Sequence, residues 1–146
     1  MDSAEGHAVV ERQFSFDLSA EFGHRDITSE VESVVTEAAI STGLAVVQLV
    51  GSTGAVTTIE YEAGALEDLR RALDVMAPVD GDYRHNARWG DGNGFSHVRS
   101  ALLKTSLAIP VVAGRLSLGT WQQIVILNLD NRRRSRTITV VVIGAG

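Results

Sequence analysis

The sequence predicts an α+β fold built on a mostly antiparallel sheet, arranged as a sandwich or a distorted barrel, with two main helices and one short helix. Amphipathic stretches at helical spacing occupy the first two thirds of the chain, and short apolar runs divided by turn residues fill the last third. Single helices between strands, followed by a run of hairpins, favour α+β over a doubly wound parallel fold. A chain of 146 residues has the size of one domain, so we expect a single domain over residues 1–146.

Three stretches show the apolar spacing of helices. The first follows Asp26 and Thr28, either of which can cap a helix, and Gly43 offers a left-handed stop after it. The second has an apolar stripe opposite its charged residues and is ended by Pro78. The third is short and begins at Phe95. The predicted helices cover residues 28–42, 66–76 and 95–103.

The remaining apolar runs predict strands. Residues 9–18 alternate between apolar and polar side chains, as in a strand with one face on the core. Residues 44–50 are almost wholly apolar, which is typical of a strand covered on both faces. In the last third, short runs alternate with turns, and this spacing predicts an antiparallel meander. The predicted strands cover residues 9–18, 44–50, 55–59, 107–112, 115–118, 121–129 and 136–143.

Charge and composition exclude several classes of function. The 13 Lys and Arg residues against 18 Asp and Glu give a net charge of −5, which repels nucleic acid and anionic membrane surfaces. The absence of cysteine excludes disulfides, thiolate metal ligands and a Cys nucleophile. The first residues lack the basic and apolar regions of a secretory signal, and no apolar run approaches the roughly 20 residues that span a bilayer. We therefore expect a cytoplasmic protein that binds neither nucleic acid nor membranes.

The segment between the second and third helices carries candidate chemistry. Residues 79–94 are rich in Gly, Asp and Asn without an apolar period, which predicts a long loop, and such loops often have a function. His85 and His97 flank its glycine-rich part, and imidazole suits both zinc ligation and proton transfer near neutral pH. Their separation matches no established metal spacing, so two hydrogen-bonded loop histidines are the alternative interpretation.

Three further features are compatible with a binding or catalytic role. Residues 51–54 follow an apolar strand, where free backbone N–H groups can receive an anion, and a plain turn is the commoner alternative. The arginines within residues 132–136 suit phosphate or carboxylate, with a solvated hairpin tip as the alternative. Glu60 and Glu62 would share a strand face and could supply a general base, with helix capping as the alternative.

Five segments form an ordered series from the middle of the chain onwards. They are Ser52-Thr53-Gly54-Ala55-Val56-Thr57 with Glu60, Tyr83-Arg84-His85, Ser96-His97-Val98-Arg99-Ser100-Ala101-Leu102, Thr105-Ser106-Leu107-Ala108-Ile109-Pro110-Val111, and Gly114-Arg115-Leu116-Ser117-Leu118-Gly119-Thr120-Trp121-Gln122. The series resembles the YjbQ family, whose members are called secondary thiamine-phosphate synthases, over residues 14–143. The Gly-Thr-Trp-Gln block and the spaced histidine segments are its most specific parts.

The resemblance implies a YjbQ-like fold, assembly as a homotrimer, and a site of three histidines that can hold a zinc-like metal. It also implies a transferase activity that joins a pyrimidine pyrophosphate to a thiazole phosphate with loss of pyrophosphate. By correspondence with the family, His85 and His97 are metal ligands and, together with Glu60, catalytic residues. The implied residues for binding a phosphorylated small molecule are Ser52, Thr53, Arg99, Trp121 and Gln122.

Two positions depart from the family pattern. Gly51 stands where the family has its first histidine, and Ile59 stands where it has an asparagine. Because glycine has no donor atom, zinc would need a carboxylate or water to complete its tetrahedron. The candidate carboxylates are Glu60, Asp82 and Asp91. Two functions therefore stay open: a synthase with a degenerate metal site, and a non-catalytic homotrimer that binds a metal or a small anionic ligand.

Overall fold

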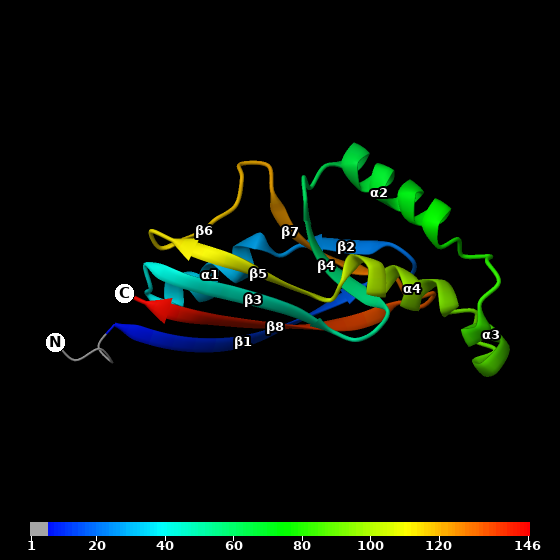
Figure 1. The fold of residues 1–146 in the computed structure, drawn as a ribbon, viewed down its shortest axis with the longest axis horizontal. Helices are drawn as coiled ribbons and strands as arrows, with labels where there is room; N and C mark the ends of the chain where they lie inside the picture. Colours follow the sequence, from blue (N-terminus) through cyan, green and yellow to red (C-terminus); the bar gives the residue numbers. More distant parts are fainter. Residues whose placement is uncertain (1–5) are drawn as a thin grey trace.

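The structure is a computed structural model that describes residues 6–146 (Figure 1). Its strands are β1 (His7–Leu18), β2 (Gly23–Asp26), β3 (Thr42–Val50), β4 (Gly54–Ile59), β5 (Ser106–Val112), β6 (Arg115–Leu116), β7 (Gln123–Asn128) and β8 (Arg134–Ala145). Its helices are α1 (Thr28–Ala38), α2 (Ala63–Met76), α3 (Arg84–Trp89) and α4 (Gly94–Leu103). Five strands form one sheet in the order β1-β8-β3-β5-β6, and β2-β7-β4 form a second. The predicted α+β class with mostly antiparallel strands is confirmed.

The strand β8 organises the larger sheet. It pairs along its whole length with β1, from His7 opposite Ala145 to Leu18 opposite Arg134. Its other edge pairs with β3 in the same antiparallel sense. Figure 1 shows β8 lying between these two strands, so the last strand of the chain occupies an interior position in the sheet.

Helix α1 covers the inner face of the larger sheet. Its apolar stripe is buried in the main core, with Val31, Val34 and Val35 at most 3 % exposed. The helix start is fixed by Asp26, whose carboxylate accepts hydrogen bonds from the Thr28 N–H at 2.9 Å and from the Thr28 hydroxyl at 2.6 Å. The N-cap position itself is taken by Ile27, without a side-chain hydrogen bond, so neither Asp26 nor Thr28 is the N-cap residue; Asp26, one residue earlier, satisfies a donor that the helix itself leaves free.

The end of α1 differs from the prediction. The helix stops at Ala38 because Ala39 takes a left-handed conformation with φ of 53°, and its N–H donates to the carbonyl groups of Val35 and Thr36. Gly43 already belongs to β3, so the expectation that it stops the helix near Thr42 is wrong. The sequence could not locate this end because alanine seldom takes the left-handed conformation that ends the helix at Ala39.

Helix α2 covers the smaller sheet. Its buried Leu66 and Leu73 belong to a second core cluster that includes Leu127 of β7. The Glu62 carboxylate caps the helix by accepting from the N–H groups of Gly64 and Ala65. Helix capping, the alternative role for this glutamate, is therefore the one observed.

Three local predictions are corrected. The segment expected to be a loop over residues 79–94 contains α3, and β2 was not predicted at all. Neither element shows an apolar period, because both are short and mostly exposed. The strand expected from Trp121 begins at Gln123, since a turn in which the Gln122 N–H donates to the Gly119 carbonyl at 3.0 Å precedes it.

None of the helices within residues 6–146 is long and apolar enough to cross a membrane. The expectation that the chain starts without a secretory signal rests in part on residues 1–5, which lie outside the described residues.

Candidate functional site

Two imidazole rings meet where α3 packs on α4. The ring centroids of His85 and His97 are 4.4 Å apart, and the ring planes are inclined at 44°. The helices can approach this closely because Gly94 has no side chain: a Cβ there would stand 2.4 Å from the Tyr83 Cβ. Asn86 fixes the contact, since its side-chain oxygen accepts a hydrogen bond from the Gly94 N–H at 2.8 Å. The structure thus brings together the two histidines that the sequence singles out.

One nitrogen of this pair has an unusual environment. The Nδ1 atom of His85 is buried and has no hydrogen-bond partner among the described residues. The Asp91 Oδ1 atom lies 3.3 Å away, within ion-pair range, but the direction of this contact is not that of a hydrogen bond. An unsatisfied buried polar atom costs about 1–3 kcal/mol, so its retention calls for an explanation. The nitrogen therefore lacks a hydrogen-bond partner at a position that is closed to solvent.

A hollow of about 390 Å³ lies beside His97. Its lining residues are Gly51, Ser52, His97, Ser100, Ala101, Lys104 and Thr105. A lysine, hydroxyl groups and an imidazole line it, and no carboxylate is among these residues. Such a lining favours a small anion over a cation. Gly51 and His97 share this hollow, in keeping with the resemblance that places Gly51 at a site position.

Gly51 is held against a buried arginine. It has φ of 148°, and a Cβ at this position would stand 2.9 Å from Nη1 of Arg136. The Arg136 side chain is fixed from the other side, because its Nη2 donates to the Thr53 hydroxyl at 2.7 Å and to the Asn128 side-chain oxygen at 2.6 Å. A side chain at position 51 would therefore meet both an unfavourable backbone conformation and a guanidinium that is hydrogen-bonded in place.

Asp130 ties three segments of the site together. Its buried carboxylate accepts hydrogen bonds from the Thr53 hydroxyl at 2.9 Å, from the Asn93 side-chain amide at 3.1 Å and from Nε of Arg134 at 3.1 Å. The backbone N–H of Arg132 is a fourth donor, at 3.0 Å. These contacts join the turn before β4, the segment that leads into α4, and the turn between β7 and β8. The placement of His97 and Gly51 relative to one another depends on this cluster.

The surroundings of this cluster lower the pKa values of Asp130 and Arg136. Burial by itself would raise the pKa of Asp130, but the hydrogen bonds from Thr53, Asn93 and the Arg132 N–H, with the positive charge of Arg134, outweigh it and lower the pKa. Burial also lowers the pKa of Arg136, whose guanidinium nevertheless remains protonated. The site is therefore supported by an ionised, largely water-excluded network, in which each charge needs its partners.

Two predicted ligand-binding residues are engaged in structural contacts. Arg99 is 1 % exposed, its Nε donates to the Ala77 carbonyl at 2.8 Å, and its Nη2 contacts the Asp74 carboxylate at 3.0 Å. Thr53 is buried within the Asp130 cluster. Neither lines the hollow beside His97, whereas Ser52 does. Arg99 thus anchors α4 to the end of α2.

The remaining predicted residues lie at the other end of β4. Glu60 follows the last residue of this strand, about 20 Å of extended chain beyond the start of β4. Trp121 is exposed, and the side-chain amide of Gln122 donates to the Thr58 hydroxyl at 3.1 Å. Within one chain Glu60 is therefore placed away from the imidazole pair, and a shared role for them has no geometric support.

The donor set around the histidines does not fit a three-ligand metal centre. Asp91 is the carboxylate beside His85, and within residues 6–146 no group of three or more His, Cys, Asp or Glu side chains is arranged to hold a metal ion. Gly51 supplies no donor atom on the side where the family has its first histidine. Zinc binding therefore stays a prediction, and no chemical step is derived through a metal.

Sequence reasoning missed the residues that hold the site together. Asp130 lay just beyond the strand expected to end at residue 129, Arg136 in a cluster considered for phosphate or carboxylate with a solvated tip as the alternative, and Asn93 in the expected loop. All three are buried. One signal was available: Asn128 and Asp130 continue the almost wholly apolar run of β7, and a polar residue in such a run has to find a buried partner.

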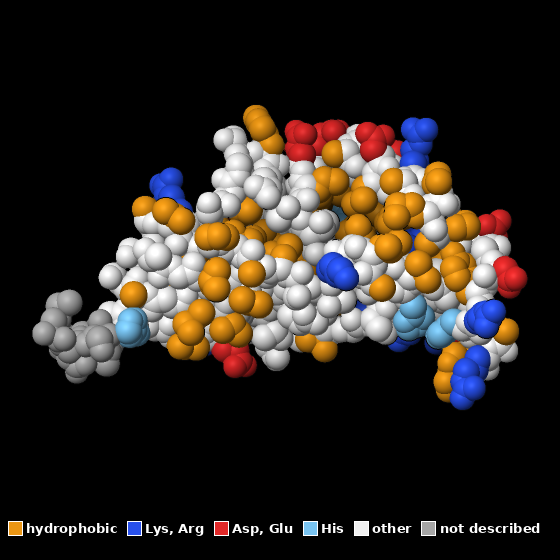
Figure 2. Space-filling view, in the orientation of Figure 1, with side chains coloured by type: hydrophobic (Ala, Val, Ile, Leu, Met, Phe, Trp, Pro, Cys, Tyr) orange, Lys and Arg blue, Asp and Glu red, His pale blue; other side chains and the backbone are white. Residues whose placement is uncertain are grey.

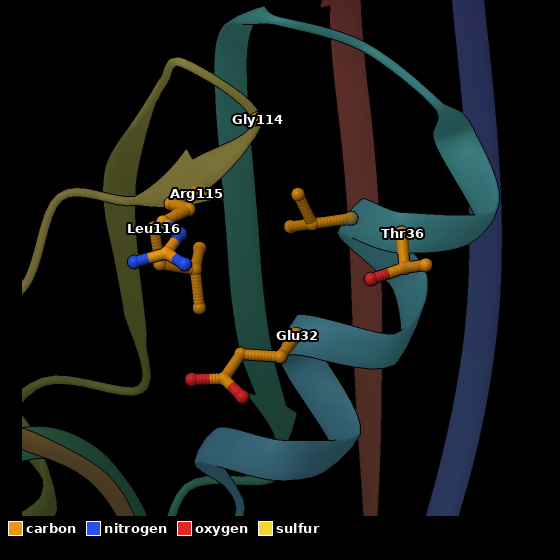
Figure 3. A pocket seen from close by; sticks show the side chains of 6 residues that line it. Glu32, Thr36, Gly114, Arg115 and Leu116 are labelled. Carbon is orange, nitrogen blue, oxygen red and sulfur yellow. The ribbon is translucent and has the colours of Figure 1, made fainter.

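A second hollow, of about 350 Å³, lies between α1 and β6. Figure 3 shows the Glu32 carboxylate and the Arg115 guanidinium turned towards the same space from these two elements, with Thr36 at its side. Both charged side chains are exposed, and none of the histidines lies there. The hollow beside His97 is therefore the better candidate for chemistry.

Comparison with known proteins gives a consistent result. A family model described as "UPF0047 protein YjbQ-like" matches residues 12–145. A UPF0047 protein of Methanothermobacter thermautotrophicus is 41% identical over 119 residues, which cover 82% of this chain and 81% of the relative. One from Mycobacterium bovis is 40% identical over 118 residues, covering 80% and 89% respectively.

Solved structures agree with the sequence matches. A protein of Sulfolobus solfataricus described as YbjQ-like and of unknown function superposes with a TM-score of 0.88 at 30% identity, covering 94% of this chain and 99% of the other. A hypothetical protein of Aeropyrum pernix gives a TM-score of 0.84 at 31% identity, covering 92% and 98%. Neither of these two proteins is described with a substrate.

Proposed function

Because the chain belongs to the UPF0047 (YjbQ-like) family, we propose that it is a transferase that binds a small phosphorylated molecule in the hollow beside His97. The observation that carries this proposal is the imidazole pair with its unpartnered, buried His85 Nδ1. His97 lines a hollow without carboxylates and its ring contacts that of His85, so the pair can exchange a proton with a phosphate group bound beside His97. The alternative of two loop histidines, each satisfied by its own hydrogen bond, does not account for the free nitrogen.

The reaction to test first is the one implied by the family resemblance. A bond forms between the pyrimidine and thiazole fragments, the bond from the pyrimidine fragment to pyrophosphate breaks, and pyrophosphate leaves with the electron pair. The leaving group gains negative charge, which a protonated imidazole and Lys104 can stabilise. Arg99 takes no part in this, because it is 1 % exposed and its Nε and Nη2 donors are used within the fold.

The test is a transfer assay on the wild type and on His85→Asn and His97→Asn. Loss of a group that transfers a proton lowers the rate by about 100–10,000-fold, so both variants should lose nearly all transfer. Arg133→Gln is the matched control, since Arg133 is an exposed residue that pairs with Asp17 on the surface. Wild-type protein without transfer activity, or histidine variants as active as the control, would contradict the proposal.

The second candidate function is a non-catalytic protein that binds a small anion. The observation in its favour is Gly51, where an arginine approaches the backbone and the family's first histidine is missing. Under this alternative the wild type binds inorganic phosphate without transferring anything. Calorimetric binding combined with an absent reaction would select it over the transferase.

Zinc titration tests the metal prediction. We expect the wild type to bind zinc weakly, because two imidazoles leave the tetrahedron incomplete. Gly51→His should tighten binding by more than about 10–100-fold if the new imidazole reaches the metal, since an added ligand acts more directly than an outer partner. The φ of 148° and the contact with Arg136 oppose the substitution, so thermal stability must be followed in parallel. A folded variant with unchanged affinity would show that position 51 is not a ligand position.

The outer face of the larger sheet supports self-association. It carries the exposed apolar residues Val9, Leu44, Val46, Val112 and Ile143. Figure 2 shows hydrophobic side chains gathered over β3 and β5 with few charged ones among them. A face of this kind on a small subunit is typical of an interface, and closed symmetric assemblies are the usual result.

We therefore propose a homotrimer, which light scattering would detect as three times the mass of the 15.6 kDa chain. Val46→Glu places a charge in the middle of the apolar face and should shift the protein to monomer. Asp68→Lys, on the exposed side of α2 and away from the larger sheet, is the control and should leave the mass unchanged. A wild type that is monomeric at micromolar concentration would contradict the assembly.

A further inference from the structure

Lys104 combines a rare backbone conformation with a rare residue type. It has φ of 78° and ψ of 156°, a region that is accessible almost exclusively to glycine. It is also the only lysine in the sequence, where every other cationic side chain is an arginine. Conformations of this kind persist only where the surrounding structure enforces them, and they concentrate at functional sites.

The surroundings of Lys104 enforce this conformation from both sides. Its N–H donates to the Ser100 carbonyl at 2.8 Å, which closes the last turn of α4. Its carbonyl accepts from the Val56 N–H of β4 at 3.1 Å, and the next carbonyl, that of Thr105, accepts from the Leu49 N–H of β3 at 2.7 Å. The residue is thus clamped between a helix and two strands, so its side chain leaves the backbone in a fixed direction.

Lys104 lies where two hollows meet. It lines the hollow beside His97. It also lines another hollow, likewise of about 390 Å³, which extends to Thr58 and Gln122 and is separate from the one between α1 and β6. No carboxylate lines either hollow, and within the described part of the chain the Lys104 ammonium forms no ion pair or side-chain hydrogen bond. An ammonium in such surroundings attracts an anionic group, and no carboxylate nearby competes for it.

We propose that Lys104 binds the phosphate or pyrophosphate group of the ligand at the junction of the two hollows, with one part of the ligand beside His97 and an uncharged part in the hollow that leads to Gln122. The proposal rests on the proposed function for the class of ligand. It adds the residue that anchors the charge and a second compartment for the rest of the molecule. It also links Gln122 to the histidine site through a shared wall rather than through direct contact.

A flexible lysine suits this position better than an arginine would. An ammonium is a compact charge with rotatable donors, so it can follow a phosphate group as bonds to that group break, whereas a guanidinium favours one planar geometry. The strained backbone would be relieved by glycine, which lacks the charge. The presence of lysine in this conformation therefore indicates that its ammonium has a role that outweighs the local strain.

The single lysine permits a selective test. Acetic anhydride modifies the ε-amine of Lys104, and peptide mapping by mass spectrometry separates this product from acetylation of the chain terminus. Inorganic pyrophosphate is the probe, and it should slow modification of Lys104 about tenfold or more at saturation. Calorimetry then compares pyrophosphate binding by the wild type, Lys104→Gly, Lys104→Ala and Lys104→Arg.

Stability and binding should change in opposite directions in one variant. Lys104→Gly should unfold about 2–4 °C higher than the wild type because the strain is relieved, yet bind pyrophosphate about tenfold or more weakly. Lys104→Ala keeps the strain and loses the binding, and Lys104→Arg keeps most of the binding. If Lys104→Gly and Lys104→Ala both bind pyrophosphate as tightly as the wild type, the proposed role of Lys104 is overturned. The function proposed for the histidine site is not affected by that result. A wild type that neither binds nor is protected would overturn the ligand class itself, and with it both proposals.

Discussion

Asp130→Ala is expected to lower the free energy of unfolding by about 2–5 kcal/mol, because two buried donors each lose their acceptor at about 1–3 kcal/mol. The substitution leaves three side-chain donors without an acceptor, on Thr53, Asn93 and Arg134. The hydroxyl and amide are buried, so water cannot readily replace the carboxylate. Denaturant unfolding followed by circular dichroism measures the change.

Asp17→Ala is the matched control. Asp17 also pairs with an arginine, at 2.7 Å, but both side chains are more than half exposed. Exposed pairs contribute about 0–1 kcal/mol, so the control should stay close to the wild type. If the free energy of unfolding falls by the same small amount in both aspartate variants, the Asp130 cluster does not support the site.

The same carboxylate gives a pH dependence. Its pKa is lowered in the folded state, so the stability that it contributes is fully present above the unfolded pKa and is lost as pH falls through the folded value. Asp130→Asn removes this contribution and should flatten the acid limb of the stability curve relative to the wild type. An unchanged acid limb would show that other carboxylates set it.

Gly94→Ala is expected to separate the two imidazoles and lower transfer activity by about 100-fold, the loss that a misplacement of about 1 Å can cause. The added methyl group would stand 2.4 Å from the Tyr83 Cβ, so α3 and α4 cannot keep their contact. Alanine favours a helix by about 1 kcal/mol over glycine, but overpacking costs about 1–3 kcal/mol, so the steric effect wins.

Gly90→Ala is the control for this substitution. Gly90 caps α3 with φ of 66° and has nothing within 4 Å of its Cβ position, so alanine there strains the backbone without pushing the helices apart. Proton NMR contacts between the rings of His85 and His97 should vanish in Gly94→Ala and persist in Gly90→Ala. Ring contacts that survive in Gly94→Ala would show that the close approach of the helices does not depend on this glycine.

The long elements with a clear apolar period were predictable from the sequence, whereas the short elements were not. α2 has a strict apolar stripe and a proline after it, so its position followed from sequence. β2 and α3 have four and six residues and few buried side chains, so their conformations are set by β7 and by the contact with α4 rather than by their own pattern. Local propensity gives no signal for elements of this kind.

The same distinction applies to the candidate site, where some residues could be found from the sequence and others could not. The two histidines stood out because they bracket an unusual segment, and the structure places their rings in contact. Asp130 could not be found from spacing, since its partners come from residues 53, 93 and 134 and meet only after the sheets have formed. The strain at Lys104 is likewise invisible in sequence, although its status as the sole lysine is not.

The position of β8 bears on how the chain reaches its fold. β8 follows every other strand in sequence, yet it fills the gap between β1 and β3. While the chain is being synthesised, both of these strands keep an unpaired edge until β8 emerges, and the loop that must close is almost as long as the chain itself. Folding should therefore be slow for a protein of this size, and the interval before β8 arrives is the stage at which the nascent chain depends most on chaperones.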